Sequence, residues 1–285
     1  MKKPLFLFLA LFLLLFPFYA VGCGQKVKLT NEELLEKVTS ASASLNTCQF
    51  NLSQTIHLSG QGKEQKIDRT TNYNIAGVVD TANKKLRLRM TIKLPKETRP
   101  QGMPETLEME RYCLGDTFYT HGNVPGMPAQ WLKSKAPAGY WESQNPAQEQ
   151  IELLKASEFK VAGREAIGVL QCWVVEIKPN LKKLQELTGG SPLSQAEAEK
   201  FEKSIKSATA KQWYAEGSFF LVKGKVELTL VTSSKELNLP GEEYNVTTDV
   251  ALVFDASHFN EPVEIELPAG AEKAIEMETP QPGQK

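Results

Sequence analysis

Residues 85–94 alternate strictly between apolar and polar side chains, and this pattern constrains the fold more than any other feature of the sequence. The apolar positions are Leu86, Leu88, Met90, Ile92 and Leu94, whereas the positions between them carry Lys, Arg or Thr. A period of two places successive side chains on opposite faces of a β-strand. The run therefore predicts a strand of an antiparallel sheet that has one apolar and one solvated face.

Similar runs recur along most of the chain and predict about ten strands, enough for one large curved antiparallel sheet. The polar segment 80–83 predicts a hairpin turn, and the Pro-, Gly- and Met-rich segments 95–104 and 122–139 predict loops. The expected strands cover 50–58, 73–79, 85–94, 105–114, 116–121, 159–165, 169–178, 213–222, 225–232 and 243–254.

Helices are predicted at a few sites only. Thr30-Asn31-Glu32-Glu33 is a capping box and predicts a helix that begins near Asn31. A second capping box at 194–197 predicts a helix with an apolar stripe, and Pro146 predicts the first position of a third helix, running to about residue 157. A short helix is also expected over 181–187. The fold class is therefore α+β. The expected stripe of the second helix consists of Ala198, Phe201, Ile205 and Ala208.

The first 22 residues have the order of charged, apolar and small residues that is typical of a secretory signal peptide. Lys2 and Lys3 precede an unbroken apolar run at 5–16, and small residues follow at 20–22. The apolar run is shorter than the roughly 20 residues of a membrane-spanning helix. We therefore expect residues 1–22 to be cleaved, which leaves a mature protein that is slightly acidic.

Ala20-Val21-Gly22-Cys23 resembles the lipobox of bacterial lipoproteins, in which the cysteine after the cleavage site is acylated. Ala20 departs from the Leu that is most frequent there. This resemblance implies lipidation of Cys23, a short tether over 23–29, and a location on the extracytoplasmic face of the bacterial cell membrane. Two or three acyl chains on one cysteine would give stable attachment. The alternative is a plain secretory leader with an incidental cysteine.

The charge balance argues against one class of partner, and the cysteine content limits the number of disulfides. The 33 basic and 34 acidic residues nearly balance and form no long basic run, so nucleic acid is not an expected partner. Export implies a compartment in which disulfides can form. If Cys23 is acylated, one disulfide at most can form among Cys48, Cys113 and Cys172, and its pairing is open.

No catalytic, cofactor or metal motif emerges from the sequence. The three histidines lack metal-ligand spacing, and neither a Gly-x-Ser-x-Gly elbow nor a phosphate-binding loop is found. Glu108 and Glu110 fall on one face of an expected strand, but alternation alone produces such a pair of solvated acids. We therefore expect a protein that is not an enzyme and that has no cofactor and no metal.

Aromatic and Met side chains gather in or beside the two expected loops. They could form the rim of a cavity for an acyl chain, or cover an open end of the sheet as ordinary core. The candidate rim residues are Phe118, Met127, Trp131 and Trp141.

Several segments resemble the LolA-like lipoprotein superfamily, in particular its LppX/LprG type. They are the lipobox, the helix that enters a strand at 32–58, the paired strands at 73–94, the motifs at 116–119 and 131–133, the strand at 174–179, and the ending at 260–265. The resemblance implies one half-barrel domain over 30–270, in which an unclosed sheet wraps around helices on its concave face. A polar tail would follow at 271–285.

This resemblance further implies an apolar cavity that carries lipid, without catalytic residues. The expected function is therefore a membrane-anchored lipoprotein that binds or carries lipid or another hydrophobic ligand. The alternative is an anchored structural or sensory lipoprotein whose cavity is filled and which acts through protein contacts. The candidate cavity-lining residues are Leu86, Leu88, Met90, Ile92, Phe201 and Ile205.

Overall fold

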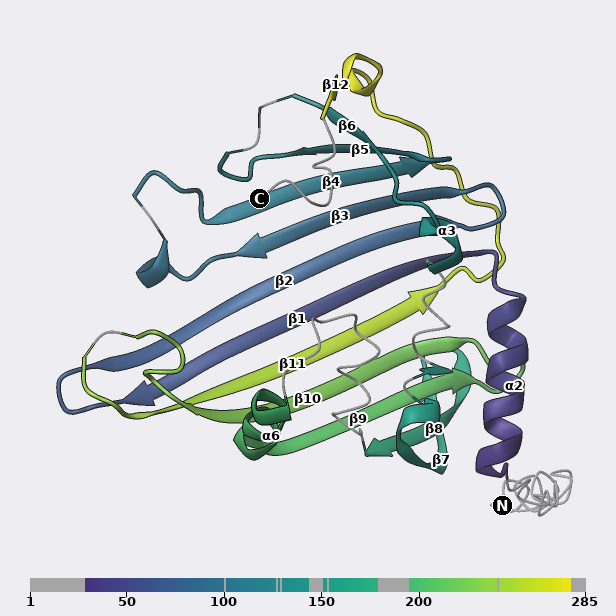
Figure 1. Ribbon diagram of the computed structural model, residues 1–285. Helices are drawn as coiled ribbons and strands as arrows, with labels where there is room; N and C mark the ends of the chain where they lie inside the picture. Colours follow the sequence, from purple (N-terminus) through teal and green to yellow (C-terminus); the bar gives the residue numbers. More distant parts are fainter. Residues whose placement is uncertain are drawn as a thin grey trace, which may run out of the picture. The chain divides into compact units, whose positions relative to one another are not determined.

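Twelve strands in the described part of the chain form one sheet (Figure 1). The computed structural model describes residues 29–99, 101–126, 128, 130–143, 151–152, 154–178, 195–239 and 241–277. Residues 31–285 form one compact unit, and the fold described below is that of this unit. The strands are β1 (Thr47–Gln61), β2 (Lys66–Asp80), β3 (Lys85–Lys93), β4 (Thr106–Leu114), β5 (Thr117–Gly122), β6 (Leu132–Lys135), β7 (Glu158–Ile167), β8 (Leu170–Lys178), β9 (Ile205–Ala215), β10 (Leu221–Ser233), β11 (Asn245–Ser257) and β12 (Ile275–Glu276).

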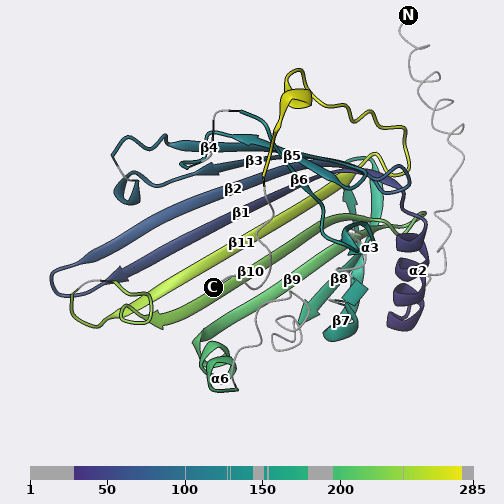
Figure 2. The ribbon, with the colours of Figure 1, turned by 45° about the horizontal axis from the view of Figure 1, so that its top comes forward.

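Two antiparallel meanders build the sheet, and one long-range pair joins them. The strand order is β12-β6-β5-β4-β3-β2-β1-β11-β10-β9-β8-β7, so β1 pairs with β11 at the junction of the two meanders. Every described pair is antiparallel except β12 with β6. Strands β7 and β12 are the two edges and do not meet, so the sheet is an unclosed half-barrel (Figure 2). The predicted fold class is confirmed.

Few helices accompany this sheet. They are α2 (Asn31–Ala43), α3 (Tyr140–Ser143), α6 (Gln195–Ser204) and the 3-10 turns η1 (Lys96–Thr98) and η2 (Ala271–Lys273). Helix α2 begins at Asn31 as predicted and buries Leu34, Val38 and Ala41. The Asn31 side-chain amide donates a 2.7 Å hydrogen bond to the Phe159 carbonyl, which ties the start of α2 to β7.

The register of the strands separates an apolar concave face from a polar face. Leu88 of β3 lies opposite Gly77 of β2 and Arg111 of β4, so its parity defines the concave side on all three strands. The exposed Arg89, on the other parity, forms an ion pair with Glu110 on the polar side. The alternation in the sequence thus predicted both faces correctly.

The polar face has its own apolar patch where the C-terminal segment crosses it. Ile265 is 2% exposed and packs with Val78 and Tyr112, and Trp131 joins this cluster. Beyond it, the Ile275 backbone N–H donates to the Trp131 carbonyl, and β12 pairs with β6. Ordered structure therefore continues past residue 270, where we expected a polar tail to begin.

Three sequence predictions about individual elements were wrong. The expected strand 213–222 is interrupted by a turn between β9 and β10, in which Phe219 has a positive φ of 59°. The expected loop 122–139 contains β6, which pairs with β5. The helix from 195 ends at Ser204, and Ile205 already pairs with Leu230 in the sheet, so its stripe does not continue. β-Branched Ile205 and the following alternating residues favour a strand over another helical turn.

Two other predicted helices lie partly or wholly outside the described residues. The start of the helix expected from Pro146 lies outside the described residues, although 151–152 and 154–156 are helical and Ile151 and Leu154 are buried. The helix expected over 181–187 lies outside them entirely.

Candidate functional site

The concave face is closed at one end by its own side chains. There Cys48, Val79, Leu86 and Cys113 form a row across β1–β4, each exposed by 4% or less. We call this row the filled end. Side chains of α2 and α3, among them Trp141, pack around it. The Trp141 indole N–H donates a 2.6 Å hydrogen bond to the Gly115 carbonyl and so fixes α3 against the β4–β5 turn.

The opposite end is closed by the loop between β10 and β11. Ile67 and Val246 are buried beneath Tyr244, which is itself 9% exposed. A Cβ atom added to Gly62 would lie 2.9 Å from the Tyr244 ring, so only glycine leaves room for the ring there. Both ends of the concave face are therefore packed as core.

Between these ends, the concave face carries apolar side chains that are only half-buried. The positions share one parity across five neighbouring strands, β3-β2-β1-β11-β10. We call them the central belt. The central belt consists of Leu52, Ile56, Ile75, Leu88, Met90, Ile92, Val226, Leu228, Val250 and Leu252.

The predicted cavity-lining residues divide between these regions. Leu88, Met90 and Ile92 belong to the central belt, whereas Leu86 is 4% exposed and belongs to the filled end. Ile205 lies opposite Leu230 and so reaches the concave face from a strand instead of a helix. Phe201 lies on α6 and is 36% exposed, so the concave face does not enclose it.

The predicted rim residues are not brought together. Phe118 and Trp141 pack at the filled end, where the Phe118 ring meets Tyr140 edge-on with 4.8 Å between centroids. Trp131 lies on the other face of the sheet, edge-on to Tyr112, where it packs in the cluster that includes Ile265 of the C-terminal segment. Met127 lies outside the described residues. The second candidate role, ordinary core, therefore fits Phe118 and Trp141.

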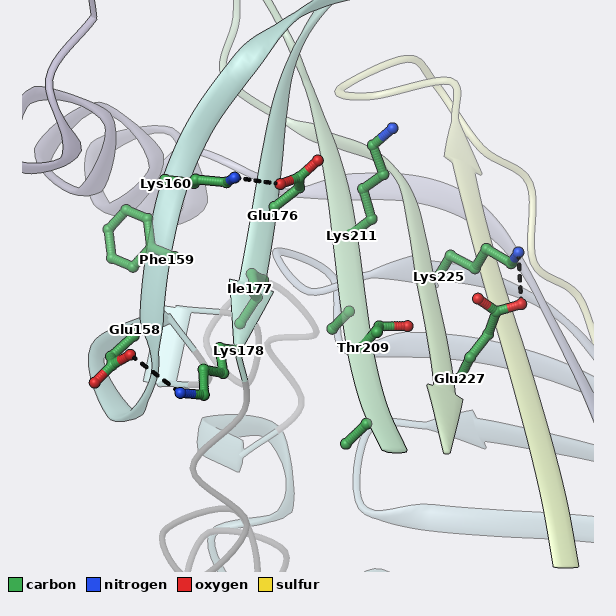
Figure 3. A pocket seen from close by; sticks show the side chains of 12 residues that line it. Glu158, Phe159, Lys160, Glu176, Ile177, Lys178, Thr209, Lys211, Lys225 and Glu227 are labelled. Carbon is green, nitrogen blue, oxygen red and sulfur yellow. Dashed lines mark ion pairs between the residues drawn. The ribbon is translucent and has the colours of Figure 1, made fainter. Parts of the chain in front are cut away.

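A groove of about 670 Å³ lies where β8 and β9 diverge (Figure 3). The two strands pair as far as Ile177 and Ala210, while β9 runs on from Ala210 to Ile205 against β10 alone among the described strands. The groove has the volume of a typical ligand site. The sequence did not reveal it, because divergence of two strands leaves no periodic signal. Its lining residues are Glu158, Phe159, Lys160, Glu176, Ile177, Lys178, Ala208, Thr209, Ala210, Lys211, Lys225 and Glu227.

Most charges in this groove are already paired with one another. Lys160 and Glu176 lie 2.9 Å apart, and Lys225 and Glu227 lie 2.8 Å apart, as the dashed lines in Figure 3 mark. The hydrogen bond from Lys160 and its positive charge lower the pKa of Glu176. These paired charges interrupt the apolar lining of the groove, whereas the central belt consists of apolar side chains alone, so the central belt is the stronger candidate for an apolar ligand.

Within the described residues, His, Cys, Asp and Glu side chains form no cluster of three or more that could hold a metal ion. Glu110 of the candidate acid pair forms its ion pair with Arg89 on the polar face. Among the described segments, none of the helices is both long and apolar enough to cross a membrane.

Cys48, Cys113 and Cys172 are all buried free thiols. Cys48 and Cys113 share one row but stand three strands apart, roughly 14 Å at the usual spacing between strands. A disulfide needs Cα atoms within about 7 Å, so these two cannot pair. Burial raises the pKa of the Cys48 and Cys113 thiols to about 11, which keeps both neutral and unreactive at neutral pH.

Solved structures similar to this chain include proteins of the kind that the sequence resembles. LppX from Mycobacterium tuberculosis is 13% identical with a TM-score of 0.40, and the match covers 82% of this chain and 99% of that chain. LprF from Mycobacterium bovis is 12% identical with a TM-score of 0.42, covering 84% and 97%. A LolA superfamily protein from Nitrosomonas europaea is 11% identical with a TM-score of 0.21, covering 83% and 95%.

These low TM-scores mean that the half-barrel assignment rests on the strand order of this chain itself. No curated protein matches the sequence. A family model does match, over residues 30–275, which is most of the chain and nearly all of the sheet described above. The chain therefore belongs to DUF6612, a family of unknown function.

Proposed function

We propose that the protein is a membrane-anchored extracytoplasmic lipoprotein that binds lipid or another hydrophobic ligand on the central belt. The observation that carries this proposal is the half-buried state of ten apolar side chains between two ends that are packed as core. Soluble proteins rarely expose a large contiguous apolar surface without a binding role. An acyl chain laid on the belt would gain about 0.8 kcal/mol for each methylene removed from water.

Binding of this kind requires no bond making or breaking. The closed ends limit the length of acyl chain that the central belt accepts. Release requires only that the ligand regain another apolar environment, such as a bilayer. An anchor on Cys23 would keep the protein beside such a bilayer and would favour handover to a neighbour over long-range transport.

Native mass spectrometry of the protein, purified in mild detergent from a lipid-containing host, tests the ligand. We expect co-purified lipid on the wild type and its loss from Met90→Asp, which places a charge in the central belt. Thr91→Asp is the matched control, because it places the same charge on the other face of the same strand and should retain lipid. Absence of lipid from the wild type, with no protection by added lipid on heating, would instead favour the filled-cavity lipoprotein.

The anchor has a separate test. Metabolic labelling with a fatty acid should mark the wild type, and Cys23→Ala should abolish the label because alanine has no thiol to carry the acyl group. Label that persists on the alanine variant would contradict the proposed lipidation.

A further inference from the structure

The two faces of the sheet differ in the charged side chains that they carry. On the polar face, cations meet carboxylates across neighbouring strands, as with Arg89 and Glu110 or Lys223 and Asp255. On the concave face, the regular positions of β1–β6 and β8–β11 carry no Asp or Glu, by the register of the described strands. Two arginines lie at these positions, Arg69 on β2 and Arg111 on β4.

Arg111 is half-buried at the boundary between the filled end and the central belt. It shares a row with Leu88, Thr120 and Leu132, of which Thr120 and Leu132 are buried. Its guanidinium lies 5.4 Å from the centre of the Phe118 ring. It forms no ion pair with any residue in the described part of the chain.

The contacts of Arg111 hold the guanidinium without neutralising it. Its Nε donates a 3.3 Å hydrogen bond to the Thr120 hydroxyl, which is a neutral partner. Guanidinium groups on apolar surfaces normally pair with a carboxylate or phosphate, which they bind through two parallel hydrogen bonds. The remaining N–H donors of Arg111 therefore suit an anion that comes from outside the chain.

The apolar surface beyond Arg111 is long enough for an acyl chain. The row of Arg111 crosses β2 at Gly77, and Arg69 lies further along that strand, roughly 27 Å away at the usual rise per residue. The hydrocarbon core of a bilayer is about 30 Å thick, so one leaflet's acyl chain needs about half of that distance. Met90 and Ile92 occupy the path on β3.

We propose that the ligand of the central belt is an anionic lipid whose head group is bound by Arg111 while its acyl chain lies along the belt. This inference rests on the proposed function and names the class of its ligand. Arg111 is favoured over Arg69 because Thr120 and Phe118 hold its guanidinium in place before any ligand binds.

Two probes with the same sixteen-carbon chain separate the contribution of the head-group charge to binding from that of the apolar tail. Radiolabelled palmitate carries a carboxylate, whereas hexadecanol does not. Both are measured on the full chain in one mild detergent, so that partition into micelles is the same for every variant. Arg111→Gln should weaken palmitate binding about tenfold, the scale of a charge-assisted hydrogen bond, and should leave hexadecanol binding within about twofold.

Two further variants control for charge and for folding. Arg87→Gln removes the same charge from the exposed, polar side of β3 and should change neither ligand. Arg111→Lys keeps a charge at the site and should retain most of the preference for palmitate over hexadecanol. If Arg111→Gln fails to fold, Arg111→Lys and Arg111→Met replace it. A preference for palmitate that Arg111→Lys retains and Arg111→Met loses would support head-group binding by Arg111, and a preference that both variants retain would overturn it.

The outcomes distinguish this inference from the function on which it rests. If neither probe binds the wild type, the proposed function fails and the inference fails with it. If both probes bind and Arg111→Gln leaves their ratio unchanged, the function stands and the head-group assignment is overturned. A loss of palmitate preference in Arg69→Gln alone would also overturn it, because the head group would then lie at the opposite end.

Discussion

Leu86 and Ile92 lie on the same face of the same strand, yet only Leu86 is enclosed. Leu86 is 4% exposed among Cys48, Val79 and Cys113, whereas Ile92 is half-buried on the central belt. Both positions arise from one alternating run, so alternation identifies a face but not what covers it. The difference comes from α2 and α3, which pack at one end of the sheet and are distant from β3 in sequence.

The largest effect should come from truncating the enclosed residue. Leu86→Ala should lower the free energy of unfolding by about 2–5 kcal/mol, because it leaves a cavity in packed core. Ile92→Ala should cost half of that or less, because less of its surface is buried on folding. Urea denaturation of both variants in lipid-free solution measures the comparison. Equal losses would show that the central belt is packed as tightly as the filled end.

For each side chain involved, a smaller effect is expected from pH, and it again concerns the filled end. The folded protein keeps Cys48 and Cys113 neutral up to a pKa of about 11, whereas their ordinary value is 9.0. The unfolded chain ionises first, so this contribution to stability is complete below pH 9 and is lost as the pH rises towards 11. The loss is at most roughly 2–3 kcal/mol for each thiol.

Denaturant midpoints between pH 8 and 11 measure this loss. The double variant Cys48→Ala/Cys113→Ala should show a shallower decline than the wild type over that window. The same slope in both proteins would mean that these thiols are not held in an apolar environment.

The smallest effect is expected on the polar face. Arg89→Gln removes an ion pair with Glu110 whose arginine side chain is 71% exposed, so it should cost less than about 1 kcal/mol. Lipid occupancy in native mass spectra should not change, because Arg89 lies on the side opposite Leu88 and Met90. A loss of lipid in this variant would mean that the ligand contacts both faces.

Local patterns in the sequence predicted the sheet well where one face meets water. Residues 85–94 and the turn at 80–83 needed no tertiary information, and the turn forms as expected, with the Asp80 carboxylate accepting a hydrogen bond from the Asn83 backbone N–H. The break between β9 and β10 was predictable, because the polar residues Glu216, Gly217 and Ser218 form the turn there.

The candidate site was only partly predictable for a related reason. Ile205 fits a helical stripe with Phe201 and equally fits a strand, and its pairing with Leu230 decides between them. No sequence pattern indicates Arg111 as a site residue, because its position on the concave face follows from the register of β4 with β3. The divergence of β8 and β9 depends on contacts between strands that no single run of residues encodes.

The pairing of β1 with β11 also sets the order in which the molecule can be completed. Each meander consists mainly of neighbours in the chain, so either can form from local contacts. The seam between them joins residues 49–60 to 246–257 and cannot close until nearly the whole chain has been made. Contacts of such long sequence separation slow folding. Until β11 arrives, one edge of β1 exposes unpaired backbone beside Leu52 and Ile56, which makes the unfinished chain prone to aggregation.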